Sequence, residues 1–244
     1  MRPVVKSVKG KSEGHYKPWG DAKPELIGEI GSFCSYCEKQ VTRSSLHIEH
    51  IKGRKVTNKE GELIYADLCY DWNNFLLACS NCNSTKSNKD IALTNPFLPH
   101  QNNLIHFIEI DSEGRVVIKS GIAQDKLSKV QAFMDLVGLD RLPGHPDYSE
   151  KDDRWQSRLE ARDLAQRQFS KYNSTPRSTD IENIVSLSKE KGFFSVWYYQ
   201  FSNHPEVLDA LINGYIIDGA KKIPFMGTHT GSFEAPTFMT VERM

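Results

Sequence analysis

The chain has 244 residues, of which 39% are apolar and 25% are charged, as is usual for a soluble globular protein. Its 31 basic and 31 acidic residues cancel, which excludes a strongly cationic chain that binds nucleic acid by net charge alone. No apolar run approaches the roughly 20 residues that span a bilayer, and the basic residues 1–11 have no apolar stretch behind them. We therefore expect a cytoplasmic protein with no membrane partner, whose five cysteines serve a metal or catalysis before disulfides.

The sequence predicts a short helix over residues 21–30, because apolar residues repeat there at helical spacing, Pro24 lies in the first turn and Gly31 ends the pattern. The next segment, residues 34–88, is dense in cysteine, histidine and asparagine. Residues 95–103 hold two prolines and no periodicity, which predicts a linker.

The remainder of the chain is expected to be mostly helical. Residues 104–120 predict a β-hairpin, with Leu104 in its first strand and a turn at residues 111–114. Further helices are predicted over residues 126–137, 152–170 and 205–212, and one between a capping box of Thr179 and Glu182 and a stop at Gly192.

Six aromatic residues lie between Phe193 and Phe201. Such a cluster can stack on bases, but it is more often part of a hydrophobic core, which we favour. Together the segments predict an α+β protein of three parts. These are an N-terminal extension with a short helix (1–30), a small zinc module (31–94) and a mostly α-helical C-terminal region with a β-hairpin (95–244).

Two pairs of cysteines frame the dense segment, Cys34-Ser-Tyr-Cys37 and Cys79-Ser-Asn-Cys82. Each pair can supply two thiolates from one tight turn, and two pairs complete a tetrahedral site of the kind that holds structural zinc. Its binding energy would support a module with little apolar core. A redox dithiol or a chance pattern is the alternative for one pair, but two pairs around a polar cluster favour zinc. Cys69 is left over, and we predict a small buried side chain.

Between the pairs, the chain carries groups suited to cutting a phosphodiester bond. That reaction requires a water nucleophile, a base that takes its proton, and a cation near the phosphate. A histidine such as His50 can serve as the base. The carboxylate of Glu49 and the amide of Asn83 are hard ligands for Mg²⁺ or Mn²⁺. Neighbours in a strand point to opposite faces, so Glu49 and His50 share a site only if the strand ends or bends, which Gly53 permits.

The alternation over residues 46–51 is also typical of an ordinary half-buried strand, whose histidines lie on the surface or in hydrogen bonds. Without the cysteine frame, that interpretation is the better one. With the frame, we favour a functional His50 and a structural His47.

The joint pattern resembles that of the HNH endonucleases, which have the ββα-metal fold. The resemblance covers roughly residues 31–90. It rests on both cysteine pairs and on Glu49, His50, Asn74, Asn83 and Lys86 between and after them.

The resemblance implies a role for each of these residues. His50 would be the general base that activates water. Glu49 and Asn83 would hold one catalytic divalent ion, Mg²⁺ or Mn²⁺. Asn74 would brace the loop between the two strands and so orient His50.

The resemblance also implies a final helix that starts near Cys82, with Arg54 and Lys86 facing phosphate. The chain departs from the family pattern at three points. The acidic residue is Glu49 in place of the commoner Asp, the third motif position is Asn83 in place of His, and the proline that often follows the catalytic histidine is missing. These departures bear on the identity of the metal more than on the reaction.

A narrower resemblance extends over more of the chain. The opening Met1-Arg-Pro3, Cys34–Glu38, His47–Ile51 and Asp71-Trp72 are similar to the PtuB family, the HNH effectors of Septu anti-phage systems that also occur with some retrons. Phe225–Thr228 resembles a tail element of that group. The resemblance implies a partner, a PtuA-like ATPase of the SMC type, and a docking surface for it on the helical C-terminal region.

Two other function classes stay open: a non-catalytic zinc-dependent module that binds nucleic acid, and a pure interaction module built on the zinc knuckle. Neither needs Glu49 beside His50, or Asn74 before the second cysteine pair. We therefore favour an endonuclease of nucleic acid, with DNA as the expected substrate and an anti-phage complex as its setting.

The weak charge of the chain has a mechanistic consequence. Residues 1–90 hold 14 basic and 11 acidic side chains, and residues 91–244 hold 17 and 20. Because affinity for a phosphate backbone comes mainly from lysine and arginine, we expect weak binding to duplex and little or no cleavage by the isolated chain at physiological salt.

Overall fold

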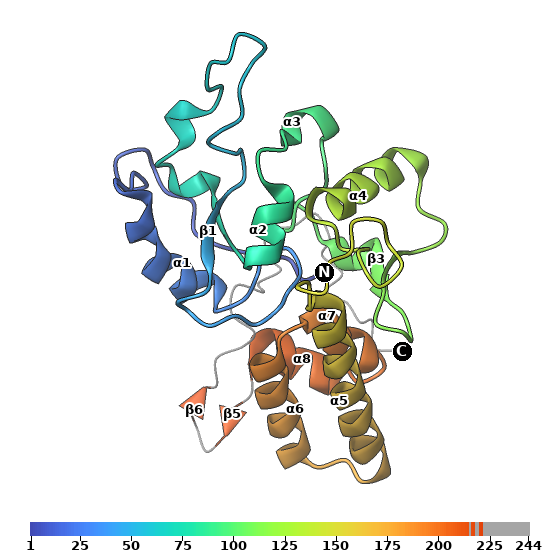
Figure 1. Cartoon of the computed structure of the whole chain (residues 1–244). Coiled ribbons are helices and arrows are strands. Elements are labelled where there is room, and N and C mark those ends of the chain that lie inside the picture. The colour runs from blue at the N-terminus through green and yellow to red at the C-terminus, as the bar shows by residue number, and fades with distance from the viewer. Residues whose placement is uncertain (215, 218–219, 222–244) are drawn as a thin grey trace.

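The computed structural model describes residues 1–214, 216–217 and 220–221, and it confirms an α+β protein with small two-stranded sheets (Figure 1). The tail element Phe225–Thr228 lies outside these residues. The α-helices are α1 Lys23–Ile30, α2 Ser80–Lys86, α3 Ile91–Thr94, α4 Gln124–Val137, α5 Arg154–Ser174, α6 Ser178–Lys191, α7 Phe194–Gln200 and α8 Pro205–Asn213. The 3-10 helices are η1 Trp19–Ala22, η2 Ala66–Leu68, η3 Trp72–Asn74 and η4 Leu104–His106. The strands are β1 His47–His50, β2 Phe75–Ala78, β3 Ile108–Ile110, β4 Val116–Ile118, β5 Ile216–Ile217 and β6 Ala220–Lys221.

The segment between the cysteine pairs folds as a ββα unit. Strands β1 and β2 pair antiparallel, with His47 opposite Ala78 and His50 opposite Phe75, and α2 packs against β1. All of β2 is apolar and buried, as expected for a strand covered on both faces. The long connection between the two strands projects from the top of Figure 1. This unit holds the polar end of β1 close to the last turn of α2, where Lys86 contacts Glu49 and the His50 carbonyl.

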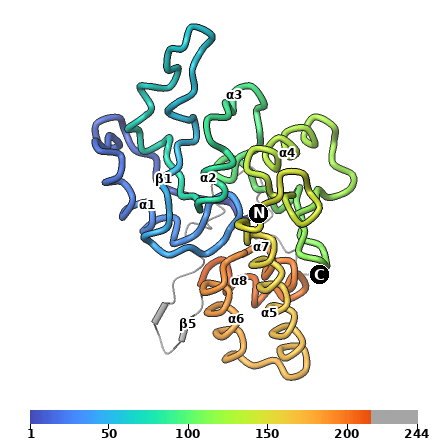
Figure 2. The backbone as a smooth tube through the Cα atoms, viewed as in Figure 1, coloured from blue at the N-terminus to red at the C-terminus, as the bar shows by residue number. Residues whose placement is uncertain are grey.

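Buried apolar side chains form two clusters. The first runs from Met1 to Leu139 and joins α1, the β1–β2 hairpin, the four paired cysteines and α4. The second joins α5 to α8 and includes Phe33 and Ile105 from earlier in the chain. Figure 2 shows α5 to α8 gathered below α1 to α4. The three-part division at residues 30 and 94 stays a prediction, but buried side chains continue across both boundaries.

The helical region is fixed to the first cysteine pair through Glu38. The buried Glu38 carboxylate accepts hydrogen bonds from the Ser195 N–H at 3.1 Å and from the Ser195 hydroxyl at 2.7 Å. Its backbone carbonyl accepts from Phe193 N at 2.9 Å. Gly192 has φ of 76°, and a Cβ there would lie 2.5 Å from Gln40 N. Only glycine fits such a close approach of two backbones.

Most of the predicted elements are confirmed. The helix over 21–30 is present as η1 followed by α1, and the later helices lie within a few residues of their predicted ranges. The aromatic cluster is core, since Phe193, Phe194, Trp197 and Phe201 are fully buried. The linker at 95–103 has no helix or strand, yet it packs closely: Leu98 is buried and the Pro99 carbonyl accepts from Val4 N.

Three local predictions are wrong. Leu104 begins the 3-10 helix η4 and not a strand, because the Asn103 side chain accepts from Ile105 N and caps that turn. The helix α6 begins before Thr179, and no side chain caps it. Cys69 is only half-buried, because it lies on the projecting connection.

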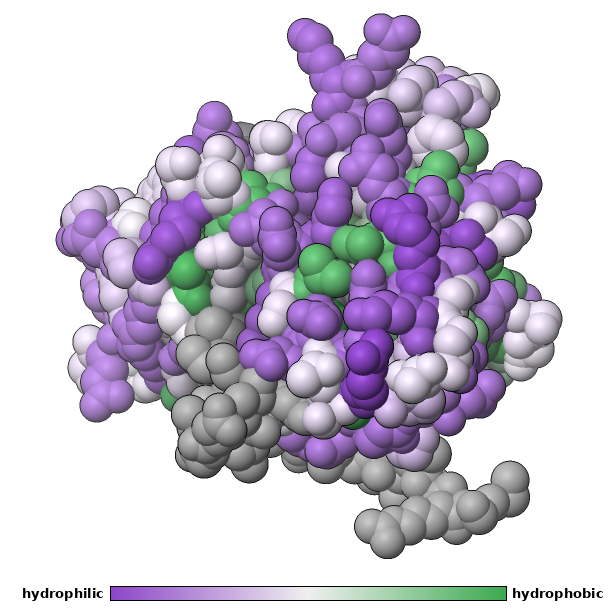
Figure 3. All heavy atoms as spheres, turned by 90° about the horizontal axis from the view of Figure 1, so that it is seen from below, coloured by the Kyte–Doolittle hydropathy of each residue, from purple (hydrophilic) through white to green (hydrophobic). Residues whose placement is uncertain are grey.

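The surface seen from below is mainly hydrophilic, with small and separate hydrophobic patches (Figure 3). In the described part of the chain, every helix is too short or too polar to cross a bilayer.

Candidate active site

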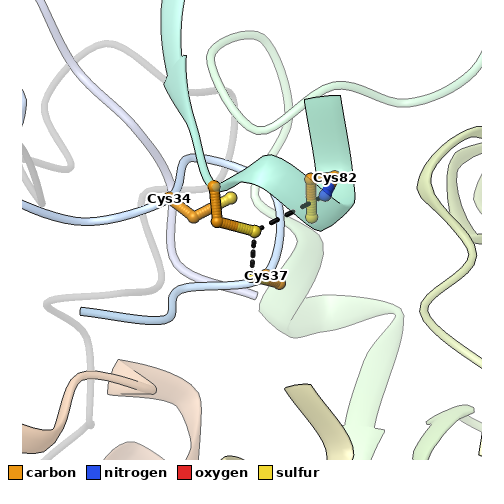
Figure 4. A group of neighbouring side chains, drawn as sticks. Cys34, Cys37 and Cys82 are labelled. Carbon is orange, nitrogen blue, oxygen red and sulfur yellow. Dashed lines mark hydrogen bonds between the residues drawn. The ribbon is translucent and has the colours of Figure 1, made fainter. Parts of the chain in front are cut away.

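The two cysteine pairs converge in the core. Figure 4 shows Cys34 and Cys37 on one loop and Cys82 on α2, with their side chains converging. The four Sγ atoms all lie within 4.8 Å of one another, and Cys37 Sγ is 3.7 Å from Cys79 Sγ. Sulfurs at about 2.3 Å from a tetrahedral zinc are about 3.8 Å apart, whereas disulfide sulfurs are about 2.05 Å apart. The donors and their spacing fit structural zinc and do not fit a disulfide.

An arginine from the helical region contacts this cluster. Four thiolates around Zn²⁺ carry two net negative charges, which are costly in a buried site without a cation. Arg154, the first residue of α5, donates from Nη1 to Cys82 Sγ at 3.2 Å, and Asp152 pairs with the same guanidinium. Burial alone would lower the pKa of Arg154, but Asp152 and the Cys82 thiol outweigh burial and raise it. The permanent charge of Arg154 therefore stabilises the thiolate form of the cluster.

A cleft of about 520 Å³ opens beside the ββα unit. It is lined by β1, by the second half of α2 and the two residues that follow it, by residues 53–55 and by the η1–α1 segment. The cleft brings together Glu49, His50 and Asn83, as the resemblance implies. His47, Lys23, Arg54 and Lys55 line it as well. Glu49 and His50 both line this cleft although they are neighbours in β1 and both pair regularly with β2, so the sequence expectation of a strand end or bend between them is not needed.

The imidazole of His50 has a fixed hydrogen-bond partner. Its Nε2 lies 2.9 Å from the backbone carbonyl of Cys69. A carbonyl oxygen only accepts, so Nε2 carries the proton and the neutral ring has its lone pair on Nδ1. Burial lowers the pKa of His50, the bond to Cys69 opposes this, and the nearby charges of Arg54 and Lys86 lower the pKa further. The ring is therefore held neutral, in the tautomer that can take a proton at Nδ1.

Two aromatic rings fix the orientation of this imidazole. The Phe75 ring lies edge-on to His50, with centroids 5.1 Å apart at 84°. The Trp19 ring does the same at 5.5 Å and 79°. Edge-to-face contacts of this kind hold a ring in one rotamer.

Lys86 does not lie where the resemblance implies. Its ammonium is buried, 2.6 Å from Glu49 Oε1 and 2.8 Å from the His50 carbonyl. A side chain that is only 1% exposed and already ion-paired cannot meet a phosphate from solvent. The sequence shows a lysine on the last turn of α2 but not which way it points. In the structure that lysine compensates the buried Glu49, whereas Arg54 is exposed and lines the cleft.

Glu49 and Asn83 supply the donor chemistry of an open magnesium or manganese site. Glu49 and Asn83 line the same cleft, with Glu49 Oε1 buried against Lys86, and such ions commonly take one or two carboxylates with water and substrate oxygens. Burial raises the pKa of Glu49, and the Lys86 ammonium acts in the opposite direction. A divalent ion would also favour the ionised carboxylate. The donor set fits such an ion.

The segment that forms this site is similar to known proteins. Residues 34–89, which contain both cysteine pairs and the ββα unit, match the family model described as HNH endonuclease. The segment from residue 34 to residue 89 is an HNH endonuclease domain. The chain is also 26% identical, over 117 residues, to a candidate HNH endonuclease of retron Vc95 from Vibrio cholerae serotype O1 biovar El Tor. That alignment covers 46% of this chain and 53% of the relative, so the chain spans about half the length of the protein it matches.

Within the HNH domain, Asn74 holds the loop that follows β1. Its Oδ1 accepts from Lys52 N at 2.8 Å, and its Nδ2 donates to the carbonyls of Lys52 and Leu68, each at 3.1 Å. These bonds join both ends of the projecting connection, next to the Cys69 carbonyl that holds His50. Asn74 thus makes the contacts that a positioning residue of His50 needs.

Replacing Asn74 by alanine is expected to lower kcat by about 10- to 100-fold with little change in KM, because a small misplacement of a catalytic group is that costly. It should also destabilise the domain by about 1–3 kcal/mol, since buried backbone groups lose their partners. Steady-state cleavage kinetics and denaturant unfolding measure the two effects. The matched control is Asn73→Ala, whose exposed side chain bonds only to Lys9 in the described structure. Equal kcat values for the two variants would show that Asn74 does not position His50.

Three groups in or near the site carry no signal in a single sequence. Trp19 and Lys23 line the cleft from a helix that precedes the HNH domain, and Arg154 reaches the cysteines from far along the chain. No motif or spacing joins them to the dense segment. Only the fold brings them there.

Proposed function

We propose that this protein is a metal-dependent endonuclease that hydrolyses phosphodiester bonds in DNA, with His50 as the general base. The observation that carries the proposal is the bond between His50 Nε2 and the Cys69 carbonyl. It leaves the Nδ1 lone pair for a water proton, in a cleft that also contains Glu49 and Asn83.

Each residue of the site has its own role in the proposed reaction. His50 takes the proton of the attacking water at Nδ1, and the resulting imidazolium keeps its Nε2 bond to Cys69. Glu49 and Asn83 would hold the divalent ion, which when bound would supply positive charge to the scissile phosphate. Arg54, exposed at the rim, binds a neighbouring phosphate. Asn74 holds the loop that follows β1 and so keeps the His50 imidazole in position.

The proposed setting is an anti-phage defence complex of the Septu or retron kind. Its support is the retron relative and the resemblance of the opening and HNH motifs to PtuB proteins. The partner would be a PtuA-like ATPase that docks on the helical region α5–α8. Near-neutral charge supports such a partner, because the isolated chain has no excess of cations over acidic groups with which to hold duplex DNA.

Cleavage of plasmid DNA by the zinc-loaded chain tests the proposal, with Mg²⁺, Mn²⁺ or neither, and with or without the co-expressed ATPase. We expect cutting that needs the divalent ion, that weakens steeply between about 50 and 200 mM salt, and that returns at the higher salt when the ATPase is present. An RNA substrate in parallel identifies the nucleic acid. If neither ion supports cutting of either substrate at low salt with the partner present, the chain is a binding module and not a nuclease.

A further inference from the structure

One wall of the cleft comes from outside the HNH domain. The matched segment begins at Cys34, but Trp19, Gly20 and Lys23 line the cleft from η1 and α1. The first core cluster anchors this wall, because α1 is buried in it and Trp19 packs against it. The wall is therefore a fixed part of the site.

The indole of Trp19 contacts two groups of the proposed machinery. Its ring lies edge-on to His50, 5.5 Å between centroids. The Arg54 guanidinium carbon lies 5.7 Å from the centroid of the same indole. One side chain therefore touches both the base and the proposed phosphate-binding group.

Arg54 depends on this contact for its placement. It is exposed, on the loop just after β1, and among the described residues no hydrogen bond or ion pair holds its guanidinium. A guanidinium stacked on an aromatic face loses less conformational freedom when it binds phosphate than one that moves freely in water. Lys23 and Lys55 line the same cleft, so a polyanionic strand that enters it meets two cations in addition to Arg54.

We propose that Trp19 is a positioning residue of the nuclease site, whose indole orients the His50 imidazole and presents the Arg54 guanidinium to the phosphate next to the scissile bond. This inference rests on the proposed nuclease function. It assigns a role to a residue that precedes the HNH domain, and it makes the N-terminal extension part of the active site.

Kinetic variants separate the two contacts. Arg54→Ala should raise KM a few-fold and leave kcat nearly unchanged, because a flanking phosphate contact acts on ground state and transition state alike. Trp19→Leu should raise KM to the same extent and also lower kcat by about tenfold, through loss of His50 orientation. Combining Trp19→Leu with Arg54→Ala should raise KM no further, since both changes remove one interaction. Trp19→Phe, which retains a flat ring, should recover most of kcat.

The matched control is Trp155→Leu, since Trp155 is a half-buried tryptophan on α5, outside the cleft, that donates to the Glu113 carbonyl. Its kcat and KM should equal those of wild type. A kcat within twofold of wild type for zinc-loaded Trp19→Leu, or KM effects that multiply in the double variant, would overturn the inference. If wild type itself does not cut, the nuclease proposal fails instead, so the two failures are distinct.

A second measurement does not require Trp19→Leu to fold. The difference in fluorescence between wild type and Trp19→Phe isolates the emission of Trp19. Binding of a DNA oligonucleotide without divalent ion should change this emission in wild type, because Arg54 turns toward phosphate, and should leave it unchanged in Arg54→Ala. An emission that does not respond to the oligonucleotide in wild type, or that responds equally in both, would contradict the proposed contact.

Discussion

Replacing Cys82 by serine is expected to remove zinc and to unfold the HNH domain. The four Sγ atoms lie within 4.8 Å of one another, and Cys82 also accepts the Arg154 contact at 3.2 Å. Structural zinc in small modules contributes roughly 10–16 kcal/mol of apparent binding free energy, and most of it is lost when a site is opened. Elemental analysis of zinc and thermal unfolding followed by circular dichroism measure the loss.

The matched control for this change is Cys69→Ser. Cys69 is the one cysteine outside the cluster, and its interaction with His50 uses the backbone carbonyl and not the thiol. This variant should keep one zinc per chain and the wild-type melting temperature. A Cys82→Ser protein that retains zinc and melts like wild type would show that the cluster is not a metal site.

Replacing His50 by alanine is expected to lower the rate of cleavage by about 1,000-fold, within the range of 100- to 10,000-fold that a general base contributes. The zinc site should stay intact, because the four cysteines do not contact the imidazole in the described structure. Single-turnover cleavage of a labelled oligonucleotide, with enzyme in excess, isolates the chemical step from substrate binding and product release.

His47→Ala is the control for that experiment. His47 lies on the same strand and lines the same cleft, but its side chain is exposed. Its loss should change the single-turnover rate by less than about twofold, as is usual for an exposed side chain with no part in the chemistry. If His47→Ala is the slower variant, the two histidines have been assigned in the wrong order.

Local spacing made the zinc frame and the ββα unit predictable. Two CxxC pairs can close around one metal wherever the intervening chain folds back, so Cys34 and Cys82 could be joined without knowledge of the fold. The shared site of the neighbours Glu49 and His50 was harder to predict, because side chains of consecutive residues in a regular strand point to opposite faces. They nevertheless line one cleft, although both lie in β1 and pair with β2.

Contacts between distant segments were not predictable from one sequence. Lys86 lies at a helix end that predicts a surface cation, yet it is buried against Glu49. Trp19 and Arg154 reach the HNH domain through the packing of the η1–α1 segment and of α5, which depends on both core clusters. The Cys69 carbonyl sets the tautomer of His50. It is a backbone atom on a loop without a motif, so the residue type at this position does not predict the contact.

Chemical rescue tests the role of His50 most directly. A His50→Gly variant leaves space for free imidazole, which can accept a proton from water as the side chain does. With zinc content and oligonucleotide binding verified, the account predicts that added imidazole restores cleavage in proportion to its concentration, while wild type does not respond. A His50→Gly protein that binds zinc and substrate but stays at background cleavage with any amount of imidazole would contradict the assignment of His50 as the general base.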